Sequence, residues 1–589
     1  MWPFRNRYPL ASVEQIAGCE YDYIIVGGGT AGCAVASRLS EDPTVSVLLL
    51  ERGDLDDRWI TRIPLASVAN GTYMVRKPTV SGSGTGNRQS DIITAETLGG
   101  NSRINAMIYT RGVPAYFHRW AQLGHPEWDW AVVEPYFRKV EDMRRKSLNQ
   151  ATAGASLGMV QIIQHEPVSE VYPFLQKSAR SLGLHVETDY NRLNGPAMGY
   201  YNFDLTIDNN GYRHSAERAY LPYGLVQQRG SLHVCTGAMV IRLDFSATDD
   251  VASGITLRSI HAKSNHEIHV KAKREVILTA GAICTPQILQ LSGIGPAVLL
   301  EEHGILVRRN LPGVGNSLSD HSAFPVFIDV AAHDTLYEVA KSPFQALKQF
   351  LLFAAFGSGW LKSSIDRGIF LNTAHIDPSN MTVSGGESAL DASKVENIPD
   401  VEIMIVPVNT RPDIYPNNSS ITFQTCLNQP FSTGTVKISS SDPTTHPTIC
   451  LGTLSDSRDR EVARKALRFS LHLAEQFVRH SGYPHPCTIL GGPGPGSSCR
   501  SWKEPSNDEL DDYIKKHIDS VYHLTSSCRM GIQEEGGVVD DELRVHGLRN
   551  VRIADASVLP NITSGHPMAA VYMVAERCAD FIKATWNGA

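Results

Sequence analysis

The chain has 589 residues, of which 42% are hydrophobic and 20% are charged, and its formal net charge is -7. This length exceeds what one hydrophobic core usually covers, so we expect two intertwined domains. The composition is ordinary for a globular protein, and the acidic balance argues against electrostatic adhesion to nucleic acid or to an anionic membrane.

Targeting, membrane and metal signals are missing from the sequence. Residues 1–18 hold no apolar run of the length that a secretory signal requires, so we expect a cytoplasmic protein. The most apolar stretch, residues 350–356, is far shorter than the roughly 20 residues that cross a bilayer, and it predicts a buried helix. The ten cysteines show no CxxC spacing, which predicts neither a metal site nor a disulfide scaffold.

The first organised segment alternates strand, helix and strand. Residues 21–26 are an apolar, β-rich run, residues 30–40 are rich in alanine, and residues 45–50 are a second apolar run. This order predicts a β-turn-α-β unit.

Later patterns indicate that two domains are interleaved. Residues 232–276 alternate as strands, while residues 551–555 and 569–585 indicate a last strand and a closing helix. Residues 401–406 and 434–438 alternate as half-buried strands, which we assign to a second sheet that covers the cofactor. The predicted fold class is therefore α/β, with a discontinuous Rossmann-type FAD-binding or NAD-binding domain over 20–157, 230–330 and 516–589 and an interleaved α+β substrate-binding domain over 158–229 and 331–515.

A glycine motif, Gly27-x-Gly29-x-x-Gly32, lies between the first strand and the first helix. Gly27 permits the tight turn, Gly29 lets backbone approach a pyrophosphate, and Gly32 lets helix and strand pack closely. Thr30 and Ala31 begin the helix, whose N-terminus offers amide donors to the phosphates. In this context the motif predicts dinucleotide binding.

An acidic residue, Glu51, ends the second strand, where a carboxylate can bind a ribose diol. The same carboxylate disfavours a 2′-phosphate, so NADP is not expected. The motif and Glu51 leave NAD and FAD open.

Three longer segments decide between these cofactors. Residues 95–112 read AETLGGNSRINAMIYTRG, residues 281–295 read GAICTPQILQLSGIG, and residues 522–568 contain YHLTSSCRMG, VVD, IADAS and HPM. In this order they resemble the signatures of the glucose-methanol-choline family of FAD-dependent oxidoreductases. The resemblance extends from about residue 20 to residue 585.

The resemblance implies which residues contact FAD. Close to the flavin it places Gly99, Gly100, Asn105, Ala106 and Ile108. It further implies that Val240 contacts the adenine, that Asp555 lies near the pyrophosphate and ribitol, and that Pro567 and Met568 lie beside the pyrimidine end of the flavin.

Three positions depart from the family pattern or vary within it. Glu96 replaces the usual basic residue and Asn101 replaces the usual Ser or Thr, which puts local flavin contacts in doubt. Some members tether FAD through a histidine just before the conserved asparagine, where this chain has Ile104. We therefore expect non-covalent FAD.

Two histidines are the candidate catalytic residues. Removing a hydride from an alcohol leaves a proton on oxygen, and a histidine can accept it near neutral pH. By resemblance, His523 is this general base, and His566 binds the substrate oxygen and positions it above the flavin. The predicted reaction is oxidation of an alcohol to an aldehyde or ketone by hydride transfer to FAD.

Other readings of the sequence stay open at this stage. No GxSxG elbow near triad partners and no HExxH spacing occur, so hydrolase and zinc-enzyme functions lack support. A few family members are FAD-retaining lyases or photodecarboxylases, and a non-catalytic flavoprotein is a further alternative. Cys426 lies where the decarboxylases carry a functional cysteine, but its spacing differs and we expect a core cysteine.

The substrate prediction rests on absences. No cluster of acids indicates a cationic substrate, and no series of polar side chains indicates a sugar, so we expect an aromatic or otherwise apolar primary alcohol of specialised metabolism. The electron acceptor is expected to be O2 or a quinone.

Overall fold

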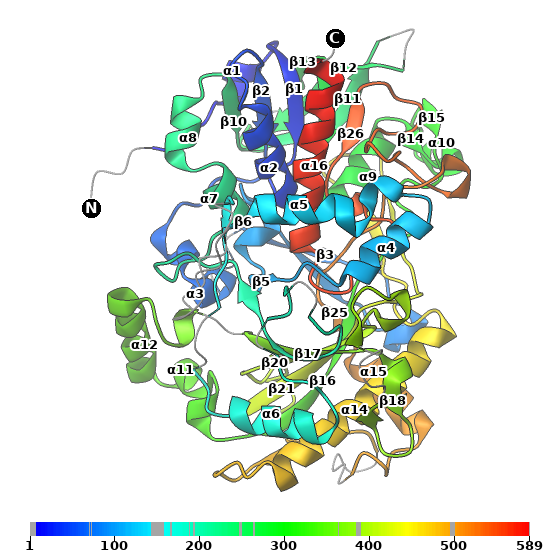
Figure 1. Cartoon of the computed structure of the whole chain (residues 1–589). Coiled ribbons are helices and arrows are strands. Elements are labelled where there is room, and N and C mark those ends of the chain that lie inside the picture. The colour runs from blue at the N-terminus through cyan, green and yellow to red at the C-terminus, as the bar shows by residue number, and fades with distance from the viewer. Residues whose placement is uncertain are drawn as a thin grey trace.

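The computed structural model describes residues 7–587, except 70, 72, 143–157, 165–167, 188, 193, 194, 247–249, 263–265, 363, 364, 385–389 and 495–500. Two seven-stranded sheets form its framework, one in the upper and one in the lower half of Figure 1. Segments from distant parts of the chain meet in each sheet.

The upper sheet has the order β10-β2-β1-β13-β12-β11, and β26 pairs with β13. Its central strands are parallel, because β1 lies between β2 and β13 in parallel register, whereas β11, β12 and β13 pair antiparallel. The buried runs in β1 and β2 are typical of a parallel sheet covered on both faces. The strands are β1 (Glu20–Val26), β2 (Val47–Leu50), β10 (Leu232–Cys235), β11 (Ala238–Phe245), β12 (Ala252–Ser259), β13 (Ile268–Leu278) and β26 (Val551–Ile553).

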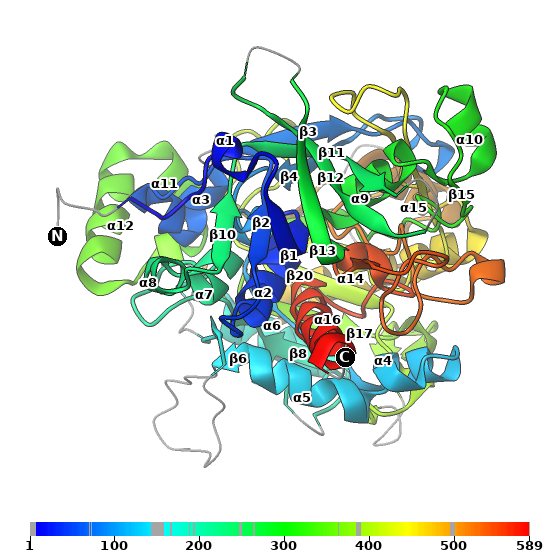
Figure 2. The same ribbon diagram turned by 90° about the horizontal axis from the view of Figure 1, so that it is seen from above.

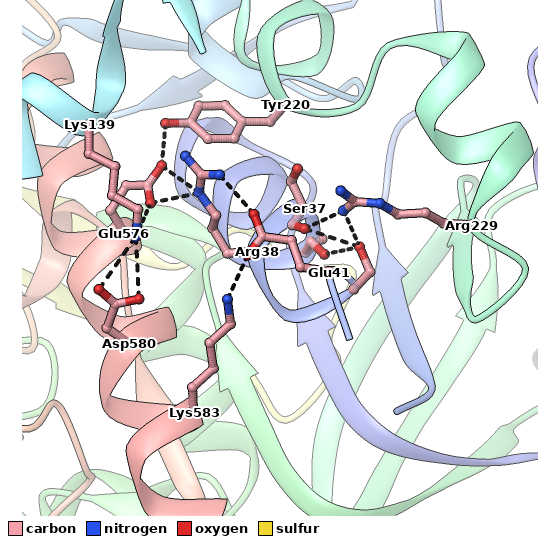
Figure 3. A network of polar contacts seen from close by, with 11 residues as sticks. Ser37, Arg38, Glu41, Lys139, Tyr220, Arg229, Glu576, Asp580 and Lys583 are labelled. Atoms are coloured by element: carbon pink, nitrogen blue, oxygen red, sulfur yellow. Dashed lines mark hydrogen bonds and ion pairs between the residues drawn. The ribbon is translucent and has the colours of Figure 1, made fainter. Parts of the chain in front are cut away.

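Helices α2 (Thr30–Leu39) and α16 (Met568–Asn587) pack side by side against this sheet, as Figure 2 shows. Buried Glu576 of α16 accepts hydrogen bonds from Arg38 of α2 at 2.8 and 3.0 Å and from the Tyr220 hydroxyl at 2.8 Å. Lys139 of α5 (Trp130–Val140) approaches the same carboxylate to 3.1 Å (Figure 3). This network fixes α2, which follows the Gly27 turn, to α16, which begins at Met568.

The lower sheet is antiparallel and has the order β24-β16-β21-β20-β17-β8, with β25 beside β16. The helices α6 (Tyr172–Ser181), α14 (Ser457–His480) and α15 (Asn507–His517) lie along its outer side (Figure 1). The strands are β8 (Gly199–Asn202), β16 (Ser322–Asp329), β17 (Arg367–Leu371), β20 (Val401–Val406), β21 (Ser420–Leu427), β24 (Thr488–Leu490) and β25 (Asp519–Ser520).

Three expectations about the second domain need correction. Residues 401–406 are buried throughout, not half-buried, because β20 is a central strand between β17 and β21. The run at 434–438 gives β22 (Thr435–Lys437), which pairs with β23 (Thr448–Cys450) outside the large sheet. Strand β16 joins the lower sheet, although it falls within the range 230–330 assigned to the first domain.

Shorter elements connect the two sheets. The small β-ladders are β3 (Met74–Pro78) with β4 (Asp91–Ala95), β5 (Ile108–Tyr109) with β9 (Asp204–Leu205), β6 (Glu141–Asp142) with β7 (Val160–Gln161), β14 (Ile294–Gly295) with β15 (Arg309–Asn310), and β18 (Ile376–Asp377) with β19 (Thr382–Val383). The remaining helices of more than one turn include α3 (Pro64–Ala69), α4 (Pro114–Gln122), α7 (Ala216–Tyr220), α8 (Tyr223–Gln228), α9 (Gly281–Leu291), α10 (Ala297–Glu302), α11 (Tyr337–Lys341) and α12 (Pro343–Phe356).

The apolar helix α12 contradicts the sequence expectation for residues 350–356. The stretch is helical, but within α12 only Phe353 is buried, and Phe350, Leu351 and Phe356 are exposed. The expectation was wrong because composition alone cannot tell whether an apolar helix has a partner. Among the described residues, no helix is long and apolar enough to cross a membrane.

Candidate active site

A cavity of about 950 Å³ lies between the two sheets. Val26 and Leu50, which end β1 and β2, form part of its wall, and Pro325, Met404 and Gln424 of the lower sheet form another part. The carboxyl ends of parallel strands are where open α/β sheets bind ligands. The cavity is therefore placed to hold a dinucleotide on one side and a second molecule on the other.

The glycine turn has the geometry that the sequence predicts. Gly27 adopts φ +111°, and a Cβ atom there would lie 2.6 Å from the Thr279 carbonyl oxygen. A Cβ on Gly32 would lie 1.9 Å from the Gly27 carbonyl oxygen, so only glycine fits. Gly29 faces open space, since its Cβ would meet only the Gly100 Cα at 4.0 Å. Gly29, Thr30 and Ala31 line the cavity, and α2 begins there with no side chain capping it. This open helix N-terminus fits a pyrophosphate.

Glu51 is fixed beside the glycine turn. Its two carboxylate oxygens accept hydrogen bonds from the amides of Gly28 and Gly53, each at 2.9 Å. Burial raises the pKa of Glu51 to about 7 although both amides oppose this shift. A carboxylate oxygen can accept more than one hydrogen bond, so Glu51 remains able to bind a ribose diol.

The segment 99–108 crosses the cavity beside the glycine turn. Gly99 has φ +97° and donates its amide hydrogen to the Gly28 carbonyl at 2.7 Å. Gly100 approaches so closely that a Cβ there would lie 2.8 Å from the Gly29 Cα. Asn105 accepts a hydrogen bond from buried Arg213 at 2.8 Å. The backbone is thus held where a flat ring system can lie against it.

Most predicted cofactor residues line this cavity, including the predicted adenine contact, the predicted pyrophosphate-side acid, and Pro567 and Met568 at the start of α16. Gly32 and Gly99 shape the backbone without lining the cavity. The predicted residues on its wall are Gly27, Gly29, Thr30, Ala31, Glu51, Gly100, Asn105, Ala106, Ile108, Val240, Asp555, Pro567 and Met568.

Asp555 is bonded within the protein. One carboxylate oxygen accepts from the Gly281 amide at 2.8 Å and from the Thr285 hydroxyl at 2.6 Å, and the other accepts from the Ser557 amide at 2.8 Å. Burial raises its pKa above the ordinary value. Asp555 therefore orders the N-terminus of α9 at the cavity wall.

His523 and His566 lie side by side on the cavity wall. Their ring centroids lie 4.8 Å apart with the planes at 76°, and both side chains line the cavity. The His566 amide donates to the Thr110 hydroxyl oxygen at 2.8 Å, and the His523 amide donates to Asp320 at 2.8 Å. The predicted pair is thus brought together by two loops far apart from the cofactor turn in sequence.

Glu402, which the sequence reading missed, contacts His566. Its Oε1 lies 3.0 Å from His566 Nε2, and its side chain is fully buried in β20. Among the described residues, Glu402 Oε2 has no hydrogen-bond partner. An acidic residue inside the apolar run of residues 401–406 was the signal that could have identified it.

His321, also missed, contacts His523. The Nδ1 atoms of the two rings lie 2.9 Å apart, and His321 Nε2 lies 3.0 Å from the carbonyl oxygens of both Asn428 and Thr563. Burial and the neighbouring His566 lower the pKa of His321 to about 3, so it is neutral. No periodicity or spacing in the sequence points to this contact.

The hydrogen bonds of His321 define the tautomers of both rings. Because Nε2 of His321 faces two acceptors, it carries the hydrogen, and Nδ1 must accept. His523 therefore donates from its own Nδ1, and its Nε2 keeps a free lone pair. Burial, together with His566 and His321, lowers the pKa of His523 well below its ordinary value.

The cavity wall beyond the histidines is largely apolar. Ile365, Met404 and Val406 line it together with Pro325. Polar side chains line the cavity as well, among them Thr410, Arg411 and Asp519. Gln424 lies opposite Met404 in the lower sheet, and its Oε1 is buried without a partner in the described structure.

Cys426 is buried opposite Glu402 in the lower sheet. It does not line the cavity, which agrees with the expected core cysteine. Across the described ranges no cluster of His, Cys, Asp or Glu could hold a metal ion.

Comparison with known proteins identifies relatives along the whole chain. Sequence profiles described as GMC oxidoreductase match residues 21–323 and residues 430–575. Dehydrogenase str4 of Strobilurus tenacellus is 33% identical over 586 residues, covering 96% of this chain and 94% of that protein. An oxygen-dependent choline dehydrogenase of Yersinia pseudotuberculosis is 32% identical over 585 residues, with coverage of 96% and 94%.

Solved structures give the same result. An FAD-dependent oxidoreductase from Chaetomium thermophilum superposes with a TM-score of 0.83 at 27% identity, covering 96% of this chain and 100% of that chain. A formate oxidase of Aspergillus oryzae gives a TM-score of 0.82 at 26% identity, with coverage of 97% and 99%. The predicted α/β class with a Rossmann-type domain is confirmed.

Proposed function

The chain belongs to the glucose-methanol-choline family of FAD-dependent oxidoreductases, and on this premise we propose that it oxidises an apolar primary alcohol with His523 as the general base. The observation that carries the proposal is the pair of histidine rings, 4.8 Å apart on the cavity wall, with a separate hydrogen-bond partner behind each ring. The photodecarboxylase alternative lacks support, because Cys426 is buried away from the cavity.

The residues present fit FAD. A Cβ atom added to Gly29 would lie no closer than 4.0 Å to a neighbouring heavy atom, and one added to Gly281 would have none within 4 Å. The backbone at these positions therefore leaves space in which a dinucleotide can bind. Ile104 lines the cavity at the tethering position, and its side chain cannot form a covalent bond to FAD. We propose non-covalent binding, for which acid precipitation releases a yellow supernatant with the spectrum of free FAD.

His523 accepts the hydroxyl proton at Nε2. The His321 contact keeps hydrogen on Nδ1, and the lowered pKa keeps the ring neutral, so the Nε2 lone pair is available at neutral pH. A positioned base contributes typically about 10²–10⁴-fold to the rate. FAD, when bound, supplies the hydride acceptor.

His566 binds and orients the substrate oxygen. Glu402 accepts the hydrogen of His566 Nε2, which fixes the ring. The Thr110 contact to the His566 amide fixes the backbone. Holding the oxygen beside the base avoids the entropic cost of aligning it during reaction.

Gln424 is the polar contact for the remote part of the substrate. Gln424 of β21 lies opposite Met404 of β20. Met404 is two residues from Glu402 and lies on the same face of the sheet. The buried, unpartnered Oε1 of Gln424 fits a hydroxyl or amine hydrogen of the substrate. The proposed substrate is therefore an apolar or aromatic primary alcohol, best when it carries one remote hydrogen-bond donor. O2 or a quinone reoxidises the flavin, and the cytoplasmic location stays a prediction.

Anaerobic bleaching of the yellow protein by a panel of alcohols tests this function. Bleaching by aromatic primary alcohols, with formation of the aldehyde, is expected. Cyanohydrin cleavage without bleaching would instead identify a lyase. A yellow protein that no alcohol reduces would identify a non-catalytic flavoprotein, and preference for choline or a hexose would contradict the substrate class.

A further inference from the structure

Helix α12 presents large apolar side chains to solvent on the flank of the molecule. Phe344 is 74% exposed, Leu347 55%, Leu351 57% and Phe356 77%. Figure 1 shows α12 at the left edge, away from both sheets, and the view in Figure 2 agrees. Contiguous apolar surface of this kind indicates an interaction site.

The helix is firmly folded, so its exposed face is not a frayed end. The Ser342 hydroxyl accepts the Gln345 amide at its N-terminus, and Gly357 with φ +59° closes its C-terminus. On the inner face, buried Phe353 packs edge-on against Tyr212 with ring centroids 5.4 Å apart. Since the inner side is already anchored, the outer face remains for another molecule.

A neighbouring segment enlarges the apolar surface. Trp59 packs against Phe350 with centroids 5.7 Å apart and donates from Nε1 to the Tyr212 hydroxyl at 3.1 Å. Ile60, beside it in the short helix Trp59–Arg62, is 44% exposed. We call Trp59, Ile60 and the exposed apolar residues of α12 the α12 patch.

The charged residues along α12 and its flanking segments are basic. Residues 339–365 contain three lysines, Lys341, Lys348 and Lys362, and no acidic residue. Lys341 and Lys348 are exposed. The acids near Trp59 are paired, since Asp56 binds Arg58 and Asp57 binds Arg62. Of the acids that bracket residues 339–365, Asp366 is buried and Glu338 is half-buried.

A second copy of this chain fits the α12 patch poorly. A two-fold contact places a surface against itself, which would bring lysines together with no acid within residues 339–365 to pair them. An anionic lipid surface complements the same features, because apolar side chains enter the acyl boundary while lysines reach the headgroups.

We propose that α12 docks this enzyme peripherally on a lipid bilayer that contains anionic headgroups. At 14 residues the helix lies in the interface and does not cross it. The overall charge of -7 opposes such binding, but screening within about 8–10 Å leaves the local lysines dominant at the patch. The proposal rests on the surface alone and is independent of the reaction.

Vesicle sedimentation of the FAD-loaded enzyme tests the proposal. We expect binding to vesicles of phosphatidylcholine and phosphatidylserine, weaker binding to phosphatidylcholine alone, and weakening by salt. Leu347→Ser with Leu351→Ser should reduce binding about tenfold or more, and Lys341→Glu with Lys348→Glu should reduce it about tenfold or more on the mixed vesicles. Reduction of the flavin by a water-soluble alcohol should stay unchanged.

A matched control uses exposed apolar residues elsewhere. Val298 is 69% and Leu306 89% exposed, and the pair Val298→Ser with Leu306→Ser should bind vesicles like the parent. Equal loss in the control, equal binding to neutral vesicles, or no vesicle binding overturns the proposal. A further outcome is a concentration-dependent dimer, with no vesicle binding, that the double variant Leu347→Ser with Leu351→Ser abolishes. This result would assign the face to a second copy of the chain and would also overturn the proposal.

Discussion

Nδ1 of His321 lies 2.9 Å from Nδ1 of His523, and the other nitrogen of His321 faces two carbonyl oxygens. His321 is thus a positioning residue that keeps hydrogen on His523 Nδ1. His321→Leu should lower the rate of flavin reduction about 10²-fold with little change in the dissociation constant of the substrate. His321→Asn supplies an acceptor oxygen near the lost Nδ1 and should retain more activity.

The His321 variants need full FAD occupancy for this comparison. Stopped-flow reduction over a range of alcohol concentrations separates rate from binding. Equal activity of His321→Leu and the parent would contradict the tautomer assignment, and equal losses for Leu and Asn would reduce His321 to a packing residue.

The pH profile follows from the electrostatics of the pair. Burial and the two neighbouring histidines lower the pKa of His523, so the unprotonated base persists below pH 6.5 and the acid limb of kcat/KM should lie below that pH. His566→Asn removes one neighbour that can carry positive charge. The acid limb should then move to higher pH, and a shift to lower pH would contradict this.

Gln424 should control selectivity between substrates. Gln424→Leu leaves a remote donor of the substrate unpaired, so kcat/KM for an aromatic alcohol with a ring hydroxyl should fall about tenfold relative to the alcohol without it. Steady-state kinetics on the matched substrate pair gives this ratio. An unchanged ratio would place the remote end of the substrate elsewhere.

The buried carboxylate of Glu576 should dominate the stability of the helix pair. Glu576→Ala leaves Arg38 and Lys139 without their shared partner (Figure 3), and we expect a loss of about 3 kcal/mol. Glu41, 39% exposed and also paired with Arg38, is the matched control, for which Glu41→Ala should cost below about 1 kcal/mol. Thermal unfolding, monitored through the release of flavin, compares the two variants. Equal shifts in the unfolding temperature would argue against a special role of Glu576.

The sequence predicted the cofactor side better than the substrate side. The Gly27 turn, Glu51 and the segment 99–108 are continuous local patterns in the sequence, although contacts with distant residues complete their geometry. Glu402 and His321 reach the histidines only through the register of the lower sheet and through loop contacts across more than 150 residues. Such pairings leave no periodic signal in one sequence.

Two of the wrong structural expectations share a physical reason. Residues 401–406 and α12 were both assigned a degree of burial from their own composition. Burial depends on what packs against an element, and β20 has strands on both sides whereas α12 has one uncovered face.

The division of labour between His523 and His566 is the central claim, and stopped-flow flavin reduction tests it most directly. His523→Ala should slow reduction by a good alcohol about 10²-fold or more, whereas His566→Asn should be milder because Asn can still hydrogen-bond the substrate oxygen. Both variants should retain FAD, since neither changes the glycine turn or Glu51, which we propose hold the other end of the cofactor. Near-parental reduction by His523→Ala would contradict the account, and a larger loss in His566→Asn would reverse the two roles.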